Sequence, residues 1–209
     1  MICDTSTISP VASAEFAADA EKVGLTFMDT PMSGGTAGAI NASLCFMVGG
    51  KQSDFEKAKV LLKPMGANYI YCGGPGMGET AKLTNNLILG INMVAAAEGF
   101  AIGEKLGMDP KILTEIIKVS SARSFTFDVF HPRPDMVPTS PSSRNYENGF
   151  QASLIKKDMI LALEAAHSAD AKTDMLEKSL DYYVQLEKKG FGRKDFGFVY
   201  QYIYKNFDI

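Results

Sequence analysis

A lysine and an asparagine one helical turn apart are the residues of this chain best suited to acid–base chemistry. The run from residue 76 to residue 97 is apolar on nearly all sides, and Lys82 is its one lysine. Such a helix is typically surrounded by protein, so we expect Lys82 to leave water at least in part. Asn86 follows four residues later on the same face. The amine can move a hydroxyl proton while the amide fixes the oxygen; the alternative is a lysine that snorkels from a buried helix.

A segment of small residues is the second candidate for chemistry. Ser33, Gly34 and Gly35 follow a strand predicted over residues 25–29. Open α/β sheets place their ligands beyond the carboxyl ends of strands, and glycines allow backbone N–H groups to approach an anion closely. One interpretation is a site for a carboxylate. The other is a glycine-rich turn over residues 31–39 that only connects two elements.

The elements that must position these residues change type near residue 78. Strands and helices alternate over residues 1–77, beginning with a strand, helix and strand that favour a parallel sheet, whereas residues 78–209 read as helices and loops. Lys157 falls in one of the later helices, where its pattern is also typical of a solvated face. Helices are predicted over residues 11–23, 54–65 with Ser53 as cap, 79–106, 110–119, 151–167, 173–188 and 194–204, and further strands near residue 2 and over residues 44–48 and 69–71.

The composition argues against several classes of partner. Lys and Arg number 21 against 24 Asp and Glu, which gives a nucleic acid partner no electrostatic support. The longest apolar stretch, residues 87–97, is too short to span a bilayer, so we expect no membrane association. The three cysteines form no C-x-x-C pair and indicate reduced thiols in an intracellular compartment. His131 and His167 lie far apart, and we expect no metal site.

Short motifs of glycine, polar and charged residues recur through the whole chain. They are Asp4–Pro10, Ser33-Gly34-Gly35, Phe46–Gly50, Gly76-x-Gly78-x-x-x-Lys82-x-x-x-Asn86, Asn145-Tyr146, Gly149-Phe150 and Lys157-Asp158. A lone glycine pair would be a weak signal, but this many ordered motifs is a strong one. In type and order they resemble the motifs of the β-hydroxyacid dehydrogenase family, most closely its 3-hydroxyisobutyrate branch.

The resemblance implies roles for individual residues. Lys82 would be the catalytic general acid and base, and Asn86 would hold the same substrate oxygen. Ser33, Gly34 and Gly35 would bind the substrate carboxylate. The nicotinamide cofactor, NAD, would contact Thr7 and Lys157.

The resemblance also implies a fold, an activity and partners. The fold would be a partial Rossmann-type α/β domain, the C-terminal part of a dinucleotide-binding domain over residues 1–77, followed by an all-α domain for substrate binding and dimerisation over residues 78–209. The activity would be NAD-dependent oxidation of 3-hydroxyisobutyrate to methylmalonate semialdehyde in valine catabolism. Tartronate semialdehyde reductase and succinic semialdehyde/glyoxylate reductase are the alternatives. A homo-oligomer, dimer or tetramer, is expected, in mitochondria if the source is eukaryotic and otherwise in the cytoplasm.

The chain departs from the family pattern at two places. Ala42 stands where the family usually has glycine, and we expect this change only to tighten a turn. The family begins earlier, with a strand and a G-x-G-x-x-G loop that holds the dinucleotide pyrophosphate, and this sequence has no such loop between a strand and a helix. The alternative to an enzyme is therefore a truncated, non-catalytic chain that self-associates through its helical domain.

Overall fold

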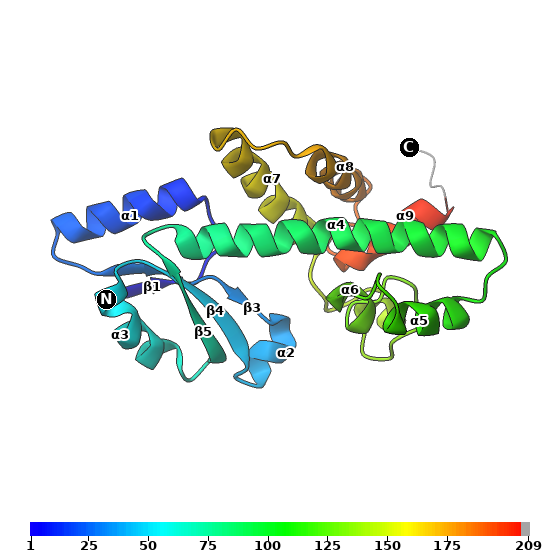
Figure 1. Cartoon of the computed structure of the whole chain (residues 1–209), viewed down its shortest axis with the longest axis horizontal. Coiled ribbons are helices and arrows are strands. Elements are labelled where there is room, and N and C mark those ends of the chain that lie inside the picture. Colours follow the sequence, from blue (N-terminus) through cyan, green and yellow to red (C-terminus); the bar gives the residue numbers. More distant parts are fainter. Residues whose placement is uncertain (206–209) are drawn as a thin grey trace. The chain divides into compact units, whose positions relative to one another are not determined.

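The computed structural model describes residues 1–205, which form two compact units. The first unit contains residues 1–86 and 164–171, and the second contains residues 87–163 and those from 172 onward. Helix α4 (Met77–Lys105) is one unbroken helix whose residues belong to both units (Figure 1). The domain boundary between residues 77 and 78 stays a prediction.

The first unit is built on a mixed five-stranded sheet. Strand β1 (Ile2–Asp4) pairs in parallel with β2 (Phe27–Asp29), and β4 (Leu44–Gly49) pairs in parallel with β5 (Gly66–Gly73). However, β4 runs antiparallel to both β2 and β3 (Met32–Ser33). The prediction of a parallel sheet is therefore correct for the first strand–helix–strand unit and wrong for the join between β2 and β4. The connection between these two strands reverses the chain direction instead of crossing over the sheet.

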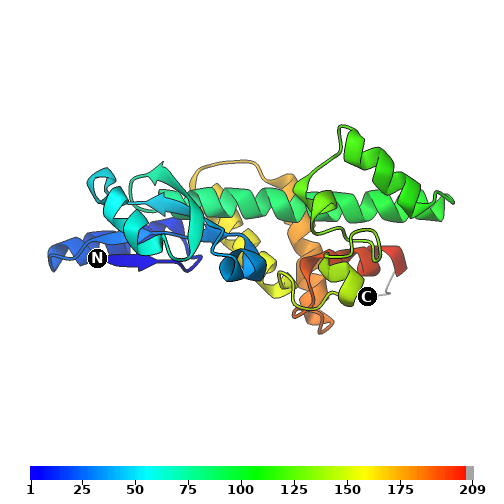
Figure 2. The same cartoon turned by 90° about the horizontal axis from the view of Figure 1, so that it is seen from below.

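Helices α1 (Pro10–Lys22) and α3 (Gln52–Leu62) cover opposite faces of this sheet (Figures 1 and 2). The alternation of side chains along β2 explains the arrangement, since Phe27 meets Phe16 of α1 at 6.2 Å between ring centroids, whereas Met28 points into the core on the side of α3. Helix α1 begins at Pro10, directly after Ser9. The cap predicted at Ser53 is wrong, because α3 already begins at Gln52 after an extended Lys51.

The segment over residues 31–39, predicted as a turn, contains strand β3 and the short helix α2 (Gly35–Ile40). The helix ends in a C-terminal cap of the Schellman type, in which the amide of Ser43 donates to the carbonyl of Gly38 at 2.8 Å. Ala42 occupies the left-handed position of this cap with φ of 50°. The expectation that Ala42 only tightens a turn was therefore incomplete, because alanine carries a conformational cost at this position that glycine does not.

Replacement of Ala42 by glycine is expected to stabilise the chain. Relief of the left-handed conformation should raise the free energy of unfolding by about 0.5–1 kcal/mol, after the greater entropy of glycine in the unfolded chain is subtracted. Urea unfolding followed by circular dichroism measures the change. Ala39→Gly, inside α2, is the matched control and should lower stability instead. An Ala42→Gly variant that is less stable than the unchanged chain would contradict this account.

The second unit consists of helices and loops. Helix α5 (Pro110–Val119) has the predicted bounds, and the Asp109 carboxylate caps it by accepting from the amide of Lys111 at 2.8 Å. The helix predicted over residues 194–204 is wrong in its first turn, where the 3₁₀ turn η2 (Phe196–Phe198) precedes α9 (Val199–Lys205). The remaining elements of this part of the chain are α6 (Phe125–Asp128), η1 (Pro141–Arg144), α7 (Ala152–Ser168), whose last residues belong to the first unit, and α8 (Asp174–Lys188).

The core of the second unit is aromatic and sulfur-rich. Its fully buried side chains include Met93 and Phe100 of α4, Met159 of α7, Tyr183 of α8 and Phe196 of η2. The Tyr183 hydroxyl donates to the carbonyl of Gly90 at 3.2 Å, and a side chain at Gly90 would collide with the Met159 sulfur. In this unit, buried side chains of α7 and α8 therefore lie against α4, as the apolar pattern of the long helix predicted.

Two general properties bear on function. Helix α4 is long and apolar enough to cross a membrane by length and composition alone, but the buried core helix of a soluble protein passes the same test, so this observation is weak. Within residues 1–205, no group of three or more His, Cys, Asp and Glu side chains lies close enough to hold a metal ion.

Candidate functional site

Lys82 lies half-buried on the second turn of α4, and its side chain is held against the main chain. The Nζ atom donates to the carbonyl oxygen of Met32 at 2.7 Å. Met32 directly precedes Ser33, so the structure brings the amine to the segment that the sequence marks as a carboxylate site. This contact ties the lysine to strand β3, whereas a snorkelling lysine would extend its amine to solvent.

Asn86 lies one turn further along α4 and is 2% exposed. Its Oδ1 atom accepts from Nδ2 of Asn85 at 3.0 Å. Because residues four apart share a helix face, the Asn86 amide is placed one turn beyond the Lys82 amine on the same side of α4. An amide this deeply buried is fixed in orientation by its partners, which suits a group that must hold one substrate oxygen.

The glycines after β3 adopt conformations that other residues rarely reach. Gly34 has φ of 135° and Gly35 has φ of 60°, and a Cβ atom at Gly34 would lie 3.0 Å from the Leu44 side chain. Ser33 pairs with Cys45 in the antiparallel ladder, so strand β3 fixes the position of the segment. Both glycines are exposed and have no side chain of their own that could cover their backbone N–H groups.

The two residues predicted to contact the cofactor lie in different units. Thr7 is half-buried in the loop after β1, and the amide of its neighbour Ile8 donates to the Glu79 carboxylate of α4 at 3.3 Å. Lys157 belongs to α7 in the second unit, where its Nζ atom lies 3.1 Å from Oδ1 of Asp158. The role of Lys157 therefore rests on the sequence resemblance.

Asp29 is a site-supporting residue that the sequence interpretation did not single out. Its carboxylate is 1% exposed and accepts from the backbone amides of Gly76 at 2.9 Å and Glu79 at 3.1 Å. It thereby caps the helix that carries Lys82. The signal available in the sequence was an acidic residue at the end of a strand together with a Gly-x-Gly segment immediately before a long helix.

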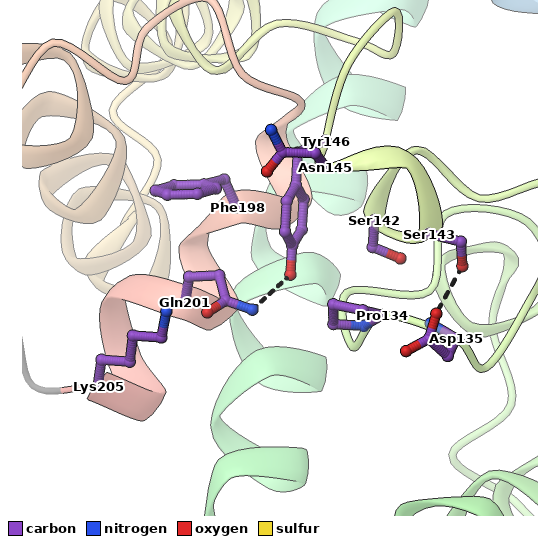
Figure 3. A pocket seen from close by; sticks show the side chains of 9 residues that line it. All are labelled: Pro134, Asp135, Ser142, Ser143, Asn145, Tyr146, Phe198, Gln201 and Lys205. Atoms are coloured by element: carbon purple, nitrogen blue, oxygen red, sulfur yellow. Dashed lines mark hydrogen bonds between the residues drawn. The ribbon is translucent and has the colours of Figure 1, made fainter.

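A hollow of about 380 Å³ lies in the second unit, and none of the predicted site residues lines it (Figure 3). It is formed around the Asn145-Tyr146 motif, whose two residues have φ of 57° and 58°. The Tyr146 hydroxyl donates to the carbonyl of Pro132 at 2.8 Å and accepts from Nε2 of Gln201 at 3.1 Å. These two hydrogen bonds give the Asn145-Tyr146 motif a role in holding this loop. The candidate site is identified by the contacts of Lys82 and not by this hollow.

Two family models match consecutive parts of the chain. Residues 1–74 match the NAD binding domain of 6-phosphogluconate dehydrogenase. Residues 76–203 match the model described as "NAD-binding of NADP-dependent 3-hydroxyisobutyrate dehydrogenase". Both models therefore describe NAD-binding domains of dehydrogenases.

Individual proteins agree with the family models. The probable mitochondrial 3-hydroxyisobutyrate dehydrogenase of Dictyostelium discoideum is 44% identical over 99% of this chain and 64% of its own length. The NAD-dependent L-serine dehydrogenase of Pseudomonas aeruginosa is 39% identical over 95% of this chain and 67% of its own. Among solved structures, the 3-hydroxyisobutyrate dehydrogenase of Mycobacterium tuberculosis with L-serine has a TM-score of 0.91 at 35% identity, over 95% of this chain and 68% of that one.

The chain is shorter than these relatives. It covers 64% of the Dictyostelium protein and 61% of the mitochondrial 3-hydroxyisobutyrate dehydrogenase of Mus musculus, which is 42% identical. The similarity nonetheless extends over nearly all of the chain, includes both consecutive NAD-binding models, and is matched by the fold. The chain therefore belongs to the 3-hydroxyisobutyrate dehydrogenase family.

Proposed function

We propose that the protein oxidises 3-hydroxyisobutyrate to methylmalonate semialdehyde with NAD, as a step of valine catabolism, and that Lys82 is its general acid and base. The observation that carries this proposal is the position of the Lys82 amine, 2.7 Å from the Met32 carbonyl and next to the Ser33-Gly34-Gly35 segment. An amine and an anion-binding segment at this spacing suit a small molecule that carries both a hydroxyl and a carboxylate.

Each residue would act on a different part of the substrate. The backbone N–H groups of Gly34 and Gly35 and the Ser33 hydroxyl bind the carboxylate and so orient the molecule. The Lys82 amine accepts the hydroxyl proton during oxidation and returns it in the reverse direction, as microscopic reversibility requires. The Asn86 amide donates to the same oxygen and holds it while the carbonyl group forms.

The residues present fit one end of the cofactor. The loop after β1 that contains Thr7 lies at the carboxyl end of a parallel strand, where α/β sheets hold nucleotides, and Glu79 ties this loop to the helix of Lys82. Thr7 would contact the nicotinamide part, and for Lys157, which belongs to the other unit, only the sequence resemblance supports such a contact. NAD, when bound, supplies the acceptor for the hydride that leaves the substrate carbon. The similarity to a model named for an NADP-dependent enzyme makes NADP the second candidate.

The substrate is tested by comparing specificity constants. For the protein at the full length that its gene encodes, kcat/KM with 3-hydroxyisobutyrate should exceed that with L-serine by about tenfold or more, because binding of L-serine requires desolvation of an ammonium group that 3-hydroxyisobutyrate lacks. We prefer this substrate because relatives of that name are more similar to the chain than the L-serine dehydrogenase is. The assay follows NADH formation. A higher specificity constant for L-serine, or for tartronate semialdehyde, succinic semialdehyde or glyoxylate when NADH consumption is followed in the reverse direction, would contradict the assignment of 3-hydroxyisobutyrate as the substrate.

A homo-oligomer in an intracellular compartment is the second part of the proposal. Helix α5 exposes Ile112, Ile116 and Val119, which lie on one face at helical spacing and are 51%, 46% and 87% exposed. A second copy of the chain would bury this face. Sedimentation velocity at micromolar protein tests the assembly, and a monomer would contradict it. The names of the Dictyostelium and mouse relatives support a mitochondrial location in a eukaryotic cell.

A further inference from the structure

The end of strand β2 joins segments that carry the candidate site residues. Asp29 pairs with Asp4 of β1 on one side and with Gly49 of β4 on the other. Three residues later, Met32 provides the carbonyl that accepts from Lys82. The path from Asp29 to the lysine amine is therefore short, both along the chain and through this hydrogen bond.

The Asp29 side chain makes a second connection to the same lysine, through the start of its helix. Gly76 N–H donates to Oδ1 at 2.9 Å, and Glu79 N–H donates to Oδ2 at 3.1 Å. The first N–H groups of a helix have no partner within it, so these two bonds fix where α4 begins and how it is rotated. Lys82 lies three residues after Glu79, on the same side of the helix.

Glycines enclose this carboxylate in backbone. A Cβ atom at Gly78 would lie 2.7 Å from Oδ2 of Asp29 and 2.5 Å from the Met47 carbonyl oxygen, and one at Gly49 would also collide with the carboxylate. Because backbone surrounds the group and it is 1% exposed, its position cannot change without movement of β2, β4 or α4. The connection between strand and helix is therefore stiff.

We infer that Asp29 is a positioning residue for Lys82: its carboxylate fixes the first turn of α4 so that the lysine amine stays against the Met32 carbonyl, beside the bound substrate. This inference rests on the proposed catalytic role of Lys82. The lysine amine donates to the Met32 carbonyl only while the first turn of α4 is held in place, so removal of the carboxylate should release the amine from this hydrogen bond. Loss of Asp29 is thus expected to change both the placement and the reactivity of Lys82.

Asp29→Asn tests the inference, with Asp195→Asn as its matched control. The asparagine keeps the size of the side chain, but its NH₂ group cannot accept from the second amide. Asp195 is also 1% exposed and also accepts from two backbone amides, those of Phe150 at 2.8 Å and Gly197 at 2.9 Å, but in the second unit. Both substitutions therefore remove the same kind of buried cap, and only the first removes the one that holds the helix of Lys82.

Two readouts follow the effect on Lys82. The rate at which acetic anhydride acylates Lys82, measured by mass spectrometry of the unliganded protein, should rise about two- to tenfold in Asp29→Asn, the size expected when the amine loses one hydrogen bond, and stay unchanged in Asp195→Asn. In the full-length protein, kcat for the hydroxyacid should fall about 10–100-fold in Asp29→Asn with little change in KM, because a misplaced catalytic group is felt in the transition state.

The outcomes separate this inference from the proposed function. Unchanged acylation of Lys82, or unchanged kcat, in a folded Asp29→Asn variant overturns the positioning role. If Lys82→Met retains full turnover, the proposed function fails, whereas a changed acylation rate in Asp29→Asn still shows that Asp29 positions the lysine. Circular dichroism checks folding. If Asp29→Asn does not fold, Asp29→Ser, whose smaller hydroxyl accepts from one amide, is held to the same two readouts.

Discussion

Replacement of Lys82 by methionine should lower kcat of hydroxyacid oxidation by about 10²–10⁴-fold, the contribution typical of a general acid–base group. Methionine keeps much of the length and apolar surface of the lysine stem, so the half-buried side chain can stay in place while the amine that contacts Met32 is lost. The steady-state rate of NADH formation by the full-length protein measures the effect. The loss should appear equally in kcat and kcat/KM, because the proton transfer belongs to the transition state.

The control for this variant is a lysine outside the candidate site. Lys63 is the exposed C-cap of α3, and Lys63→Met should leave kcat within about twofold of the unchanged protein, as expected for a surface substitution away from the site. Equal loss in both variants would point to a general effect of removing surface charge. Full activity of Lys82→Met would remove Lys82 from the mechanism.

The second large effect concerns stability in acid and depends on His131. This side chain is fully buried, with Phe100 edge-on at 4.6 Å between ring centroids. Burial lowers the pKa of His131 to about 4, and the positive charges of Lys118 and Arg133 act in the same direction, against the hydrogen bond that a protonated ring would donate to the Arg133 carbonyl. We assign the neutral ring, whose Nδ1 atom accepts from the Arg133 amide at 3.2 Å.

The chain should therefore lose stability as the pH falls from about 6.5 to about 4. The unfolded histidine takes up its proton near pH 6.5, whereas the folded one resists protonation down to about pH 4, so the stabilising contribution is complete above pH 6.5 and lost below it. The full difference corresponds to about 3 kcal/mol in the free energy of unfolding. Urea unfolding at a series of pH values measures it.

Two comparisons isolate this contribution. Burial raises the pKa of Asp195 to about 7 in the folded state, despite two amide donors, so the Asp195 contribution has the opposite sign: it is present at low pH and lost as the pH rises from 3.8 towards 7. The Asp195 contribution is the same in the unchanged chain and in His131→Gln. Subtraction of one curve of unfolding free energy against pH from the other therefore leaves the contribution of His131. His167 is exposed, so His167→Gln serves as the control for replacement of a histidine outside the core. A His131→Gln variant with the same acid sensitivity as the parent would contradict the assignment.

The parts of the fold that depend on local signals could be predicted from the sequence. The start of α5 follows from Asp109 and Pro110, since a cap and an N1 proline act within one turn. The apolar pattern likewise predicted the long helix α4 to within two residues at either end. The start of the C-terminal helix could not be predicted in the same way, because Asp195 accepts from Gly197 and tightens that turn into a 3₁₀ helix.

The features that depend on distant contacts were missed. The antiparallel join of β2 and β4 depends on which strands meet, and β3 has only two residues, too few to show a pattern. Asp29 caps α4 through the amides of Gly76 and Glu79, which lie 47 and 50 residues later in the chain. A contact between residues so far apart leaves no periodic pattern in the sequence. For the candidate site, the sequence predicted Lys82 and the Ser33-Gly34-Gly35 segment separately, and the hydrogen bond from Lys82 to Met32 shows that they are adjacent.

Chemical rescue tests the central claim, that the Lys82 amine transfers the proton, most directly. In Lys82→Ala the shortened side chain leaves room near the Met32 carbonyl for a small amine. Methylamine added to this variant should restore oxidation of 3-hydroxyisobutyrate in proportion to the concentration of its neutral form, and a series of amines should follow a Brønsted dependence on amine pKa. If amines have no effect on Lys82→Ala, or accelerate the unchanged protein equally, Lys82 is not the acid–base group.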